Sequence, residues 1–253
     1  MKAAIILGTR PEIIKMSPVI RELEHQGLDY FILHTGQHYS HNMDRLFFEE
    51  LNLPEPKYNL DVGSGTHAEE TAKMLTGVET VLVKEKPDIV LVEGDTNSVL
   101  AGALAAVKLG VKVGHVEAGL RSYDRRMPEE TNRVLTDHMS DFLFAPTDGA
   151  RRNLLREGIS ESKISVTGNT IVDVAVQNSG LLDNPSDALD DLNVEDEDYF
   201  LVTAHRQENV DDRERFQGDL RRLETHPRRV RASADLSHTP QSKEVTRRVC
   251  PEP

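Results

Sequence analysis

The chain has 253 residues, with 30 Lys and Arg against 43 Asp and Glu, and its formal net charge is −13. Its length allows one large domain or two small ones, and no apolar run approaches the ~20 residues of a membrane helix, which excludes an integral membrane protein. The single cysteine, Cys250, excludes an internal disulfide and a cysteine-rich zinc site and favours the cytoplasm, and the acidic charge argues against nucleic acid as a partner.

Strands and helices are predicted to alternate from the N-terminus onward. Residues 3–7 form a continuous apolar run that ends at Gly8, which is typical of a buried parallel strand. A helix is predicted next, because Pro11 suits a first helical turn and apolar residues then recur at helical spacing. Further strands are predicted at 31–34, 89–92, 111–116, 142–145 and 164–166, and helices at roughly 41–51, 67–85, 97–109, 129–139 and 147–157. This alternation predicts an α/β fold in which a parallel sheet carries helices on both faces.

Three segments are predicted along the chain. Residues 1–168 form an N-terminal Rossmann-like domain, residues 169–216 begin a second one, and residues 217–253 form an atypical, disordered tail. Residues 183–198 are rich in acidic side chains and contain no Lys or Arg, and a solvated connector fits them better than a calcium loop, whose glycine and final glutamate they lack. The tail is net basic without apolar periodicity, which leaves nucleic-acid binding, disorder, or a sequence that is not the natural continuation of the gene. We favour the last.

The first predicted strand and helix meet at a turn suited to phosphate. Backbone N–H groups and the dipole at a helix N-terminus attract phosphate, and Arg10 and Lys15 add positive charge beside Gly8. The alternative is an ordinary strand–helix turn with two surface cations. The pattern is neither the glycine-rich fingerprint of NAD-binding domains nor a P-loop.

Carboxylates follow two of the predicted strands and begin one predicted helix. Asp95 and Glu117 each stand just past a strand, and Glu129 and Glu130 follow Pro128 at a helix start. Because the carboxyl ends of parallel strands meet at one edge of the sheet, we expect these groups to converge on one crevice and to act as an acid–base set with separated pKa values. Taken singly, each is better explained as a helix cap or a surface acid, and it is their expected co-location that favours the acid–base interpretation.

Histidines are candidates for metal binding or proton transfer. His34, His38 and His41 lie close in sequence, but no cysteine is near them, and we expect no metal site. His115 lies inside an apolar strand and is interpreted as a core histidine with satisfied hydrogen bonds. His205 follows the first predicted strand of the second domain, so we expect it at the interdomain cleft as a proton carrier or a phosphate ligand.

Seven segments together carry a family resemblance: GTRPEIIKMSPV (8–19), HTGQH (34–38), VEGDTNS (92–98), GHVEAGLRS (114–122), PEETNRVLTDH (128–138), TGNTIVD (167–173) and TAHRQEN (203–209). From residue 1 to about 216 the chain resembles the UDP-N-acetylglucosamine 2-epimerase family of the non-hydrolysing type. The resemblance implies two Rossmann-like domains of the glycosyltransferase-B type, the second incomplete in this chain, with the active site between them. It also implies a UDP-sugar substrate, no cofactor, and a homodimer for the full-length form.

The resemblance implies an isomerase that interconverts UDP-N-acetylglucosamine and UDP-N-acetylmannosamine for polysaccharide biosynthesis. Such enzymes break the C1–O bond and remove the C2 proton, giving UDP and 2-acetamidoglucal, and UDP then adds back as a proton returns to the opposite face. The alternatives are the hydrolysing branch, which releases N-acetylmannosamine and UDP, an inactive truncated remnant, and a glycosyltransferase of the same fold. Matched motif by motif, the catalytic residues are Asp95, Glu117, Glu129 and His205, and the substrate-binding residues are Gly8, Arg10, Lys15 and Arg133.

Two departures from the family pattern bear on these expectations. The family's C-terminal domain includes a Ser-Gly-Gly segment and a following glutamate that hold the diphosphate and ribose, and nothing in this chain matches them. We therefore expect the resemblance to stop near Phe216, through truncation or a frameshift. Residues 39–44 also differ from the pattern that bacterial members carry beside an allosteric substrate site, so we do not expect allosteric activation by substrate.

Overall fold

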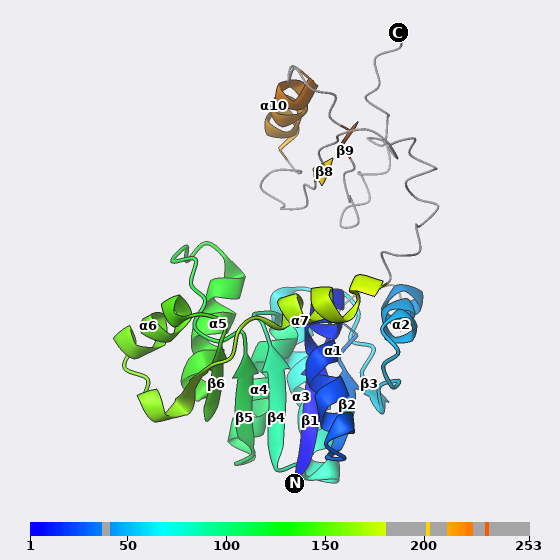
Figure 1. Cartoon of the computed structure of the whole chain (residues 1–253), viewed down its shortest axis with the longest axis vertical. Helices are drawn as coiled ribbons and strands as arrows, with labels where there is room; N and C mark the ends of the chain where they lie inside the picture. The colour runs from blue at the N-terminus through cyan, green and yellow to red at the C-terminus, as the bar shows by residue number, and fades with distance from the viewer. Residues whose placement is uncertain (37–40, 181–200, 203–211, 225–230, 233–253) are drawn as a thin grey trace. The chain divides into compact units, whose positions relative to one another are not determined.

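The computed structural model describes residues 1–36, 41–180, 201–202, 212–224 and 231–232 (Figure 1). The chain divides into two units, Met1–Gly180 and Leu181–Pro253. Among the described residues, no helix is both long and apolar enough to cross a membrane. The acidic segment 183–198, His38 and His205 lie outside the described residues.

Seven parallel strands form the sheet of the first unit, in the order β3-β2-β1-β4-β5-β6-β7 (Figure 1). Each neighbouring pair is parallel, which confirms the predicted α/β fold. The order reverses between β1 and β4, and sheets of this kind bind ligands outside the carboxyl ends of the strands at such a point. The strands are β1 (Lys2–Leu7), β2 (Asp29–His34), β3 (Tyr58–Asn59), β4 (Ile89–Glu93), β5 (Lys112–Val116), β6 (Phe142–Ala145) and β7 (Ile164–Val166).

Several helices of the first unit begin after a short polar side chain that caps them. Thr66, Thr96 and Thr147 each precede a helix, and each hydroxyl accepts a first-turn N–H. Pro18 lies inside the first helix and cannot donate to the carbonyl of Ile14, so Ser17 Oγ donates to that carbonyl at 2.7 Å and the helix continues. The helices are α1 (Arg10–His25), α2 (His41–Glu50), α3 (His67–Glu85), α4 (Asn97–Lys108), α5 (Pro128–Met139), α6 (Asp148–Arg156) and α7 (Thr170–Gln177), with a 3₁₀ turn η1 (Glu161–Lys163).

Apolar side chains alternate along β1 and fill a layer on each face of the sheet. Ala4 and Ile6 pack against residues of α3 and α4, whereas Ile5 and Leu7 pack against residues of α1 and α2. All four are fully buried, and burying an Ile or Leu side chain contributes roughly 1.5–3 kcal/mol. Because helices cover both faces of the sheet, polar side chains gather at the two ends of the strands.

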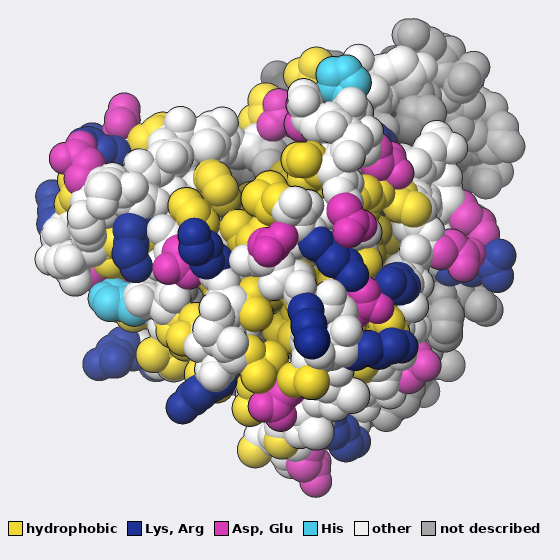
Figure 2. All heavy atoms as spheres, turned by 90° about the horizontal axis from the view of Figure 1, so that it is seen from below, with side chains coloured by type: hydrophobic (Ala, Val, Ile, Leu, Met, Phe, Trp, Pro, Cys, Tyr) yellow, Lys and Arg dark blue, Asp and Glu magenta, His cyan; other side chains and the backbone are white. Residues whose placement is uncertain are grey.

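The amino ends and the carboxyl ends of the strands, called here the amino edge and the carboxyl edge of the sheet, carry different side chains. Figure 2 shows the amino edge, where apolar side chains are exposed between Lys and Arg side chains. Leu28, Leu109 and Phe142 are among the exposed apolar residues there, and Lys112 Nζ lies 5.8 Å from the centre of the Phe142 ring. The carboxyl edge instead gathers hydrogen-bonded carboxylates and cations.

The described part of the second unit consists of β8 (Leu201–Val202), α10 (Arg213–Glu224) and β9 (Arg231–Ala232), with β8 parallel to β9. Helix α10 runs past Phe216, so residues 217–224 of the segment predicted as a disordered tail are helical. Helix α7 follows the predicted boundary at 168 and yet contacts α1, with Arg21 Nη1 donating to Gln177 Oε1 at 2.6 Å. The boundaries of the three predicted segments stay predictions.

Candidate active site

The turn between β1 and α1 is closed by the carboxyl group of Glu12. Its Oε2 accepts the N–H of Gly8 at 2.5 Å and that of Thr9 at 2.8 Å, and the Thr96 hydroxyl donates to Oε1. Burial raises the pKa of Glu12 to about 7, although these hydrogen bonds act to lower it. Two amides that we expected to bind phosphate therefore donate to Glu12 instead.

Gly8 is required in this turn by lack of space. A β-carbon at this position would lie 2.1 Å from Thr35 Oγ1 and 2.2 Å from Ser98 Oγ, two hydroxyls that are hydrogen-bonded to each other at 2.7 Å. Arg10 begins α1 two residues later, is partly buried, and forms no ion pair with another described residue. Its guanidinium is therefore available for an anion near the β1–β4 switch point.

Lys15 on α1 joins two carboxyl groups at the ends of β4 and β5. Its Nζ lies 2.6 Å from Glu117 Oε2 and 3.0 Å from Glu93 Oε1, and Asn169 Nδ2 donates to Glu117 Oε1 at 3.1 Å. Burial raises the pKa of Glu93 well above its usual range, and the adjacent Glu117 adds to the rise. Burial acts to raise the pKa of Glu117 as well, but hydrogen bonds from Glu93, Lys15 and Asn169 outweigh burial and lower it. The two carboxyls thus have separated pKa values, with Glu93 favoured as the acid and Glu117 as the carboxylate.

The backbone at Glu117 is in an uncommon conformation. Its φ angle is 67°, in the left-handed region that residues with a β-carbon rarely adopt. Such a conformation costs about 1–3 kcal/mol and persists where the surroundings enforce it. Gly119, two residues on, has a φ of +81°, and a β-carbon there would lie 2.5 Å from the carbonyl oxygen of Ala150. The turn after β5 therefore holds the Glu117 carboxylate against Lys15 at the expense of backbone strain.

A second ion-pair group surrounds Asp95. Arg133 on α5 donates through Nη2 to Asp95 Oδ2 and through Nη1 to Glu130 Oε2, the latter at 2.7 Å. Asn132 Nδ2 donates to the carbonyl of Asp95 at 2.9 Å, and the Ser122 N–H and hydroxyl donate to Glu130 Oε2 at 2.9 and 2.8 Å. Burial acts to raise the pKa of Glu130, but these hydrogen bonds and the charge of Arg133 lower it.

The register of the sheet brings Asp95 and Glu117 to the same edge. Glu93 at the end of β4 pairs with Val116 at the end of β5, so the chain leaves two adjacent strands at one level, and each strand is followed within two residues by a predicted catalytic carboxylate. Both carboxylates therefore lie at the same edge of the sheet, as parallel topology predicts.

Glu93 and Asn169 were not predicted to be functional, and Glu130 was expected in the acid–base set but was not among the residues matched as catalytic. Glu93, Glu130 and Asn169 contact Lys15, Arg133 and Glu117 respectively, whereas the predicted Glu129 is exposed at the start of α5. The acidic residue that directly follows the apolar run of β4 was a visible signal for Glu93. Glu130 differs from Glu129 only in helical phase, because it shares a face with residues three and seven positions later.

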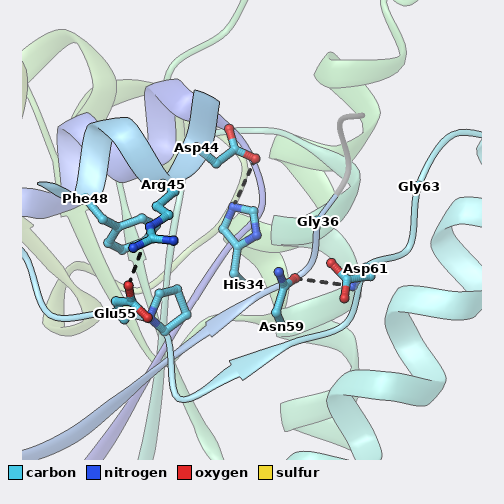
Figure 3. A pocket seen from close by; sticks show the side chains of 10 residues that line it. His34, Gly36, Asp44, Arg45, Phe48, Glu55, Asn59, Asp61 and Gly63 are labelled. Carbon is cyan, nitrogen blue, oxygen red and sulfur yellow. Dashed lines mark hydrogen bonds and ion pairs between the residues drawn. The ribbon is translucent and has the colours of Figure 1, made fainter. Parts of the chain in front are cut away.

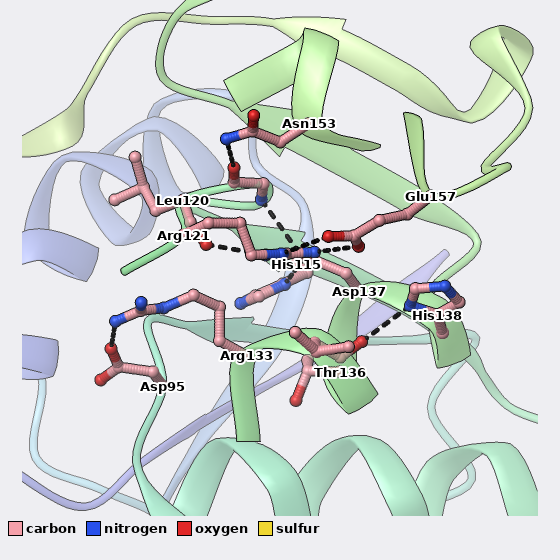
Figure 4. Close-up of polar contacts among 12 residues, drawn as sticks. Asp95, His115, Leu120, Arg121, Arg133, Thr136, Asp137, His138, Asn153 and Glu157 are labelled. Carbon is pink, nitrogen blue, oxygen red and sulfur yellow. Dashed lines mark hydrogen bonds and ion pairs between the residues drawn. The ribbon is translucent and has the colours of Figure 1, made fainter. Parts of the chain in front are cut away.

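His115 is fully buried and bonded at both ring nitrogens (Figure 4). Nδ1 lies 2.7 Å from Asp137 Oδ1, and Nε2 lies 2.8 Å from the carbonyl oxygen of Gly94. Arg121 places Nη1 2.7 Å from Asp137 Oδ2 and Nη2 2.6 Å from Glu157 Oε2. The interpretation of His115 as a satisfied core histidine is confirmed.

A separate pocket of about 380 Å³ opens at the carboxyl ends of β2 and β3 (Figure 3). His34 Nε2 lies 3.7 Å from Asp44 Oδ2 in its wall, and the His34 ring packs edge-on against Phe48. Within the described part of the chain, no group of three or more His, Cys, Asp or Glu side chains is arranged to hold a metal ion. None of the predicted catalytic or substrate-binding residues lines this pocket.

Comparison with known proteins identifies the family. The sequence model of the UDP-N-acetylglucosamine 2-epimerase family matches residues 21–250. The chain belongs to this family. The match continues past Phe216, where we expected the resemblance to stop.

Two curated relatives and one solved structure illustrate the likeness. The chain is 64% identical over 218 residues to UDP-N-acetylglucosamine 2-epimerase of Methanocaldococcus jannaschii, covering 85% of this chain and 60% of that protein. It is 62% identical over 212 residues to the enzyme of the same name from Methanococcus maripaludis, covering 83% and 57%. The crystal structure of the M. jannaschii UDP-GlcNAc 2-epimerase in complex with UDP-GlcNAc and UDP matches with a TM-score of 0.87 and 58% identity, over 96% of this chain and 67% of that one. The chain thus spans about 60% of the length of these curated relatives, and the predicted fold class is confirmed.

Proposed function

We propose that this chain is a non-hydrolysing UDP-N-acetylglucosamine 2-epimerase, which interconverts UDP-N-acetylglucosamine and UDP-N-acetylmannosamine. The observation that carries the proposal is the convergence of two carboxylate–cation pairs, Lys15 with Glu117 and Asp95 with Arg133, at the carboxyl edge beside the β1–β4 switch point. The family membership and the archaeal relatives named above support the choice of substrate.

The reaction needs carboxylates that act on both faces of a sugar carbon. The C1–O bond breaks, its electron pair leaves with UDP, and a base removes the proton from C2, so that 2-acetamidoglucal remains. The reverse addition rejoins UDP to C1 while an acid delivers a proton to the other face of C2. Asp95, Glu117 and Glu129 are the proposed catalytic carboxylates, with His205, and a positioned acid–base group typically contributes a factor of about 10²–10⁴ in rate.

The ionisation of the Lys15 cluster suits this chemistry. A lowered pKa keeps the Glu117 carboxylate ionised at neutral pH, as a proton acceptor or as the stabiliser of a positive C1 must be. Burial raises the pKa of Glu93 and so favours its protonated form. The cluster therefore pairs a carboxyl group that favours its protonated form with one that favours its ionised form.

The departing UDP needs cations and a close approach to the backbone. Arg10 and Lys15 flank the β1–α1 turn, Arg133 lies beside Asp95, and Gly8 keeps the turn free of a side chain. We propose these four residues as the substrate-binding set. Charge-assisted hydrogen bonds to a diphosphate are worth about 1.5–3 kcal/mol each.

The test is proton NMR of the purified chain with UDP-N-acetylglucosamine in D₂O. Deuterium at C2 together with a UDP-N-acetylmannosamine signal is the expected result. Free N-acetylmannosamine with UDP would instead assign the chain to the hydrolysing branch. No exchange at C2 in a sample shown by circular dichroism to be folded would refute epimerase activity for this chain.

A homodimer in the cytoplasm is proposed with this function. The single cysteine suits a reducing compartment, and the dimer is implied by the family. Light scattering after size exclusion tests the dimer, since a monomeric mass across the accessible concentration range would exclude it.

A further inference from the structure

Four ionisable side chains form a buried cluster beside the proposed site (Figure 4). His115 and Asp137 are fully buried as side chains, Arg121 is 1% exposed, and Glu157 is 27% exposed. The proposed reaction assigns none of them a role. Buried charges persist where they are paired and hydrogen-bonded, so the groups that this cluster contacts indicate what it holds in place.

Both ring nitrogens of His115 face acceptors. The Gly94 carbonyl oxygen at Nε2 can only accept a hydrogen bond. At Nδ1, burial acts to raise the pKa of Asp137, but His115 and Arg121 outweigh burial and lower it, so Asp137 is an ionised acceptor. Each ring nitrogen is therefore placed to donate a hydrogen bond, Nδ1 to Asp137 and Nε2 to the Gly94 carbonyl.

The two bonds of His115 reach the two loops that carry the proposed catalytic carboxylates. Gly94 directly precedes Asp95, has a φ of 85°, and donates its N–H to the carbonyl of Val116 at 3.2 Å. Its own carbonyl is held by His115, so both polar groups of this glycine are tied to β5. Asp137 Oδ2 in turn accepts the N–H of Gly119, in the loop after Glu117, at 3.1 Å.

A glycine with positive φ is the most mobile link in such a loop, because no β-carbon restricts it. Without its carbonyl contact, the peptide between Gly94 and Asp95 loses the bond that sets its orientation, and only the bonds of the Gly94 N–H to Val116 and of Asn132 to the Asp95 carbonyl remain on either side of it. The Asp95–Arg133 pair moves with the Asp95 side chain and does not fix the peptide before it.

We propose that His115 is a positioning residue for the epimerase proposed above: its Nε2–H holds the Gly94 carbonyl and thereby sets the place of Asp95, while its Nδ1–H is anchored on Asp137. The proposal rests on the proposed function for its catalytic meaning. The two ring nitrogens have different roles in this proposal, so substitutions that each keep one of the two hydrogen bonds can test it.

The test compares two substitutions that each keep one of the two hydrogen bonds. In His115→Gln the amide nitrogen takes the place of Nε2 and can still donate to Gly94, whereas in His115→Asn it takes the place of Nδ1 and can donate only toward Asp137. We expect His115→Asn to lower kcat by about 10²-fold, the effect of a displacement near 1 Å at a reacting group, and His115→Gln by much less. KM should change little in either, because neither substitution touches a nucleotide-binding residue.

A purely structural role predicts a different pattern. Both variants lose one buried hydrogen bond, so both should lower Tm to a similar extent. If kcat per folded molecule falls equally in both, or falls more in His115→Gln, the positioning role is refuted.

A measurement without turnover separates this proposal from the proposed function. Backbone amide exchange, followed by ¹⁵N–¹H NMR, should accelerate at Gly94 in His115→Asn and stay near the wild-type rate in His115→Gln. If the wild-type chain shows no epimerisation, the proposed function fails, but the exchange rates still decide whether His115 holds this loop. Equal exchange at Gly94 in the two variants would overturn the inference.

Discussion

Helices α1 and α3 both begin with a capping box formed by a threonine and a glutamate. We expect the ionisation of the two glutamates to change the free energy of unfolding in opposite directions. Glu12 accepts the N–H of Thr9 at 2.8 Å, and Glu69 accepts the N–H of Thr66 at 3.0 Å. Glu12 is 2% exposed, and burial raises its pKa from 4.5 to about 7. Glu69 is exposed, and its backbone and side-chain hydrogen bonds with Thr66 lower its pKa. Burial is the largest influence on the pKa of Glu12 but a smaller one at Glu69, where the hydrogen bonds with Thr66 dominate, so the two shifts have opposite directions.

The pKa of Glu12 implies a sizeable effect on stability. Because the folded state favours the protonated form, the contribution of Glu12 to the free energy of unfolding is fully present below pH 4.5 and is lost as the pH rises through about 7. The difference between 4.5 and about 7 corresponds to about 3 kcal/mol, since one pKa unit is equivalent to about 1.4 kcal/mol.

Glu12→Gln reproduces the neutral carboxyl group. The amide oxygen can accept the N–H groups of Gly8 and Thr9, and the amide nitrogen can donate to the Thr96 hydroxyl. We expect the variant to match the wild type near about pH 4.5 and to be more stable by up to about 3 kcal/mol above about pH 7. Glu69→Gln should instead be less stable than the wild type at neutral pH, with the difference vanishing as the pH falls through the lowered pKa of Glu69.

The assay is urea unfolding followed by circular dichroism, repeated across the pH range for both variants and the wild type. A loss of stability in Glu12→Gln above pH 7 would refute the reasoning. It would mean that the three hydrogen bonds and the helix dipole outweigh burial and that the ionised carboxylate is the stable form.

Four further substitutions, of which Lys2→Met is a control, test the site and the core. Lys15→Met should raise the pKa of Glu117, because a 2.6 Å ion pair is lost, and the acid limb of the pH profile of kcat/KM should move to higher pH. The control Lys2→Met removes a 2.5 Å ion pair at the amino edge and should leave the acid limb in place. Asp95→Asn should lower turnover by about 10²–10⁴-fold with the far-ultraviolet circular dichroism unchanged, and near-normal turnover would remove Asp95 from the mechanism. Thr136→Val should raise the free energy of unfolding by roughly 1 kcal/mol, because Thr136 Oγ1 is buried without a hydrogen-bond partner among the described residues, and a lowered Tm in calorimetry would contradict this.

Local sequence patterns were sufficient to predict most helices and strands of the first unit. The apolar run at 3–7 predicted β1 because a strand covered on both faces consists mainly of apolar residues. Strand β3, Tyr58–Asn59, had no such pattern, since its two residues are a strand only through their pairing with β2. The motifs also predicted the family, because they encode the turns at the carboxyl edge.

The position of the site followed from the sequence, but its contacts did not. Parallel strands must place their carboxyl ends at one edge, so Asp95 and Glu117 could be expected to meet before any side chain was placed. Whether Glu129 or Glu130 faces Arg133 depends on the phase of α5 against the sheet, which local composition does not encode.

The sequence by itself thus determined the order of strands and helices, the family, and the edge at which the carboxylates gather, because these depend on apolar periodicity and on parallel topology. Only the tertiary structure decided that Glu12 takes the amides of the β1–α1 turn and that His115 links Gly94 to Asp137. His115 lies 21 and 22 residues from these two partners, and contacts at that separation form only when packed elements bring the groups together. Burial and side-chain direction, which set the pKa values of Glu12, Glu93 and Glu117, arise from the same packing.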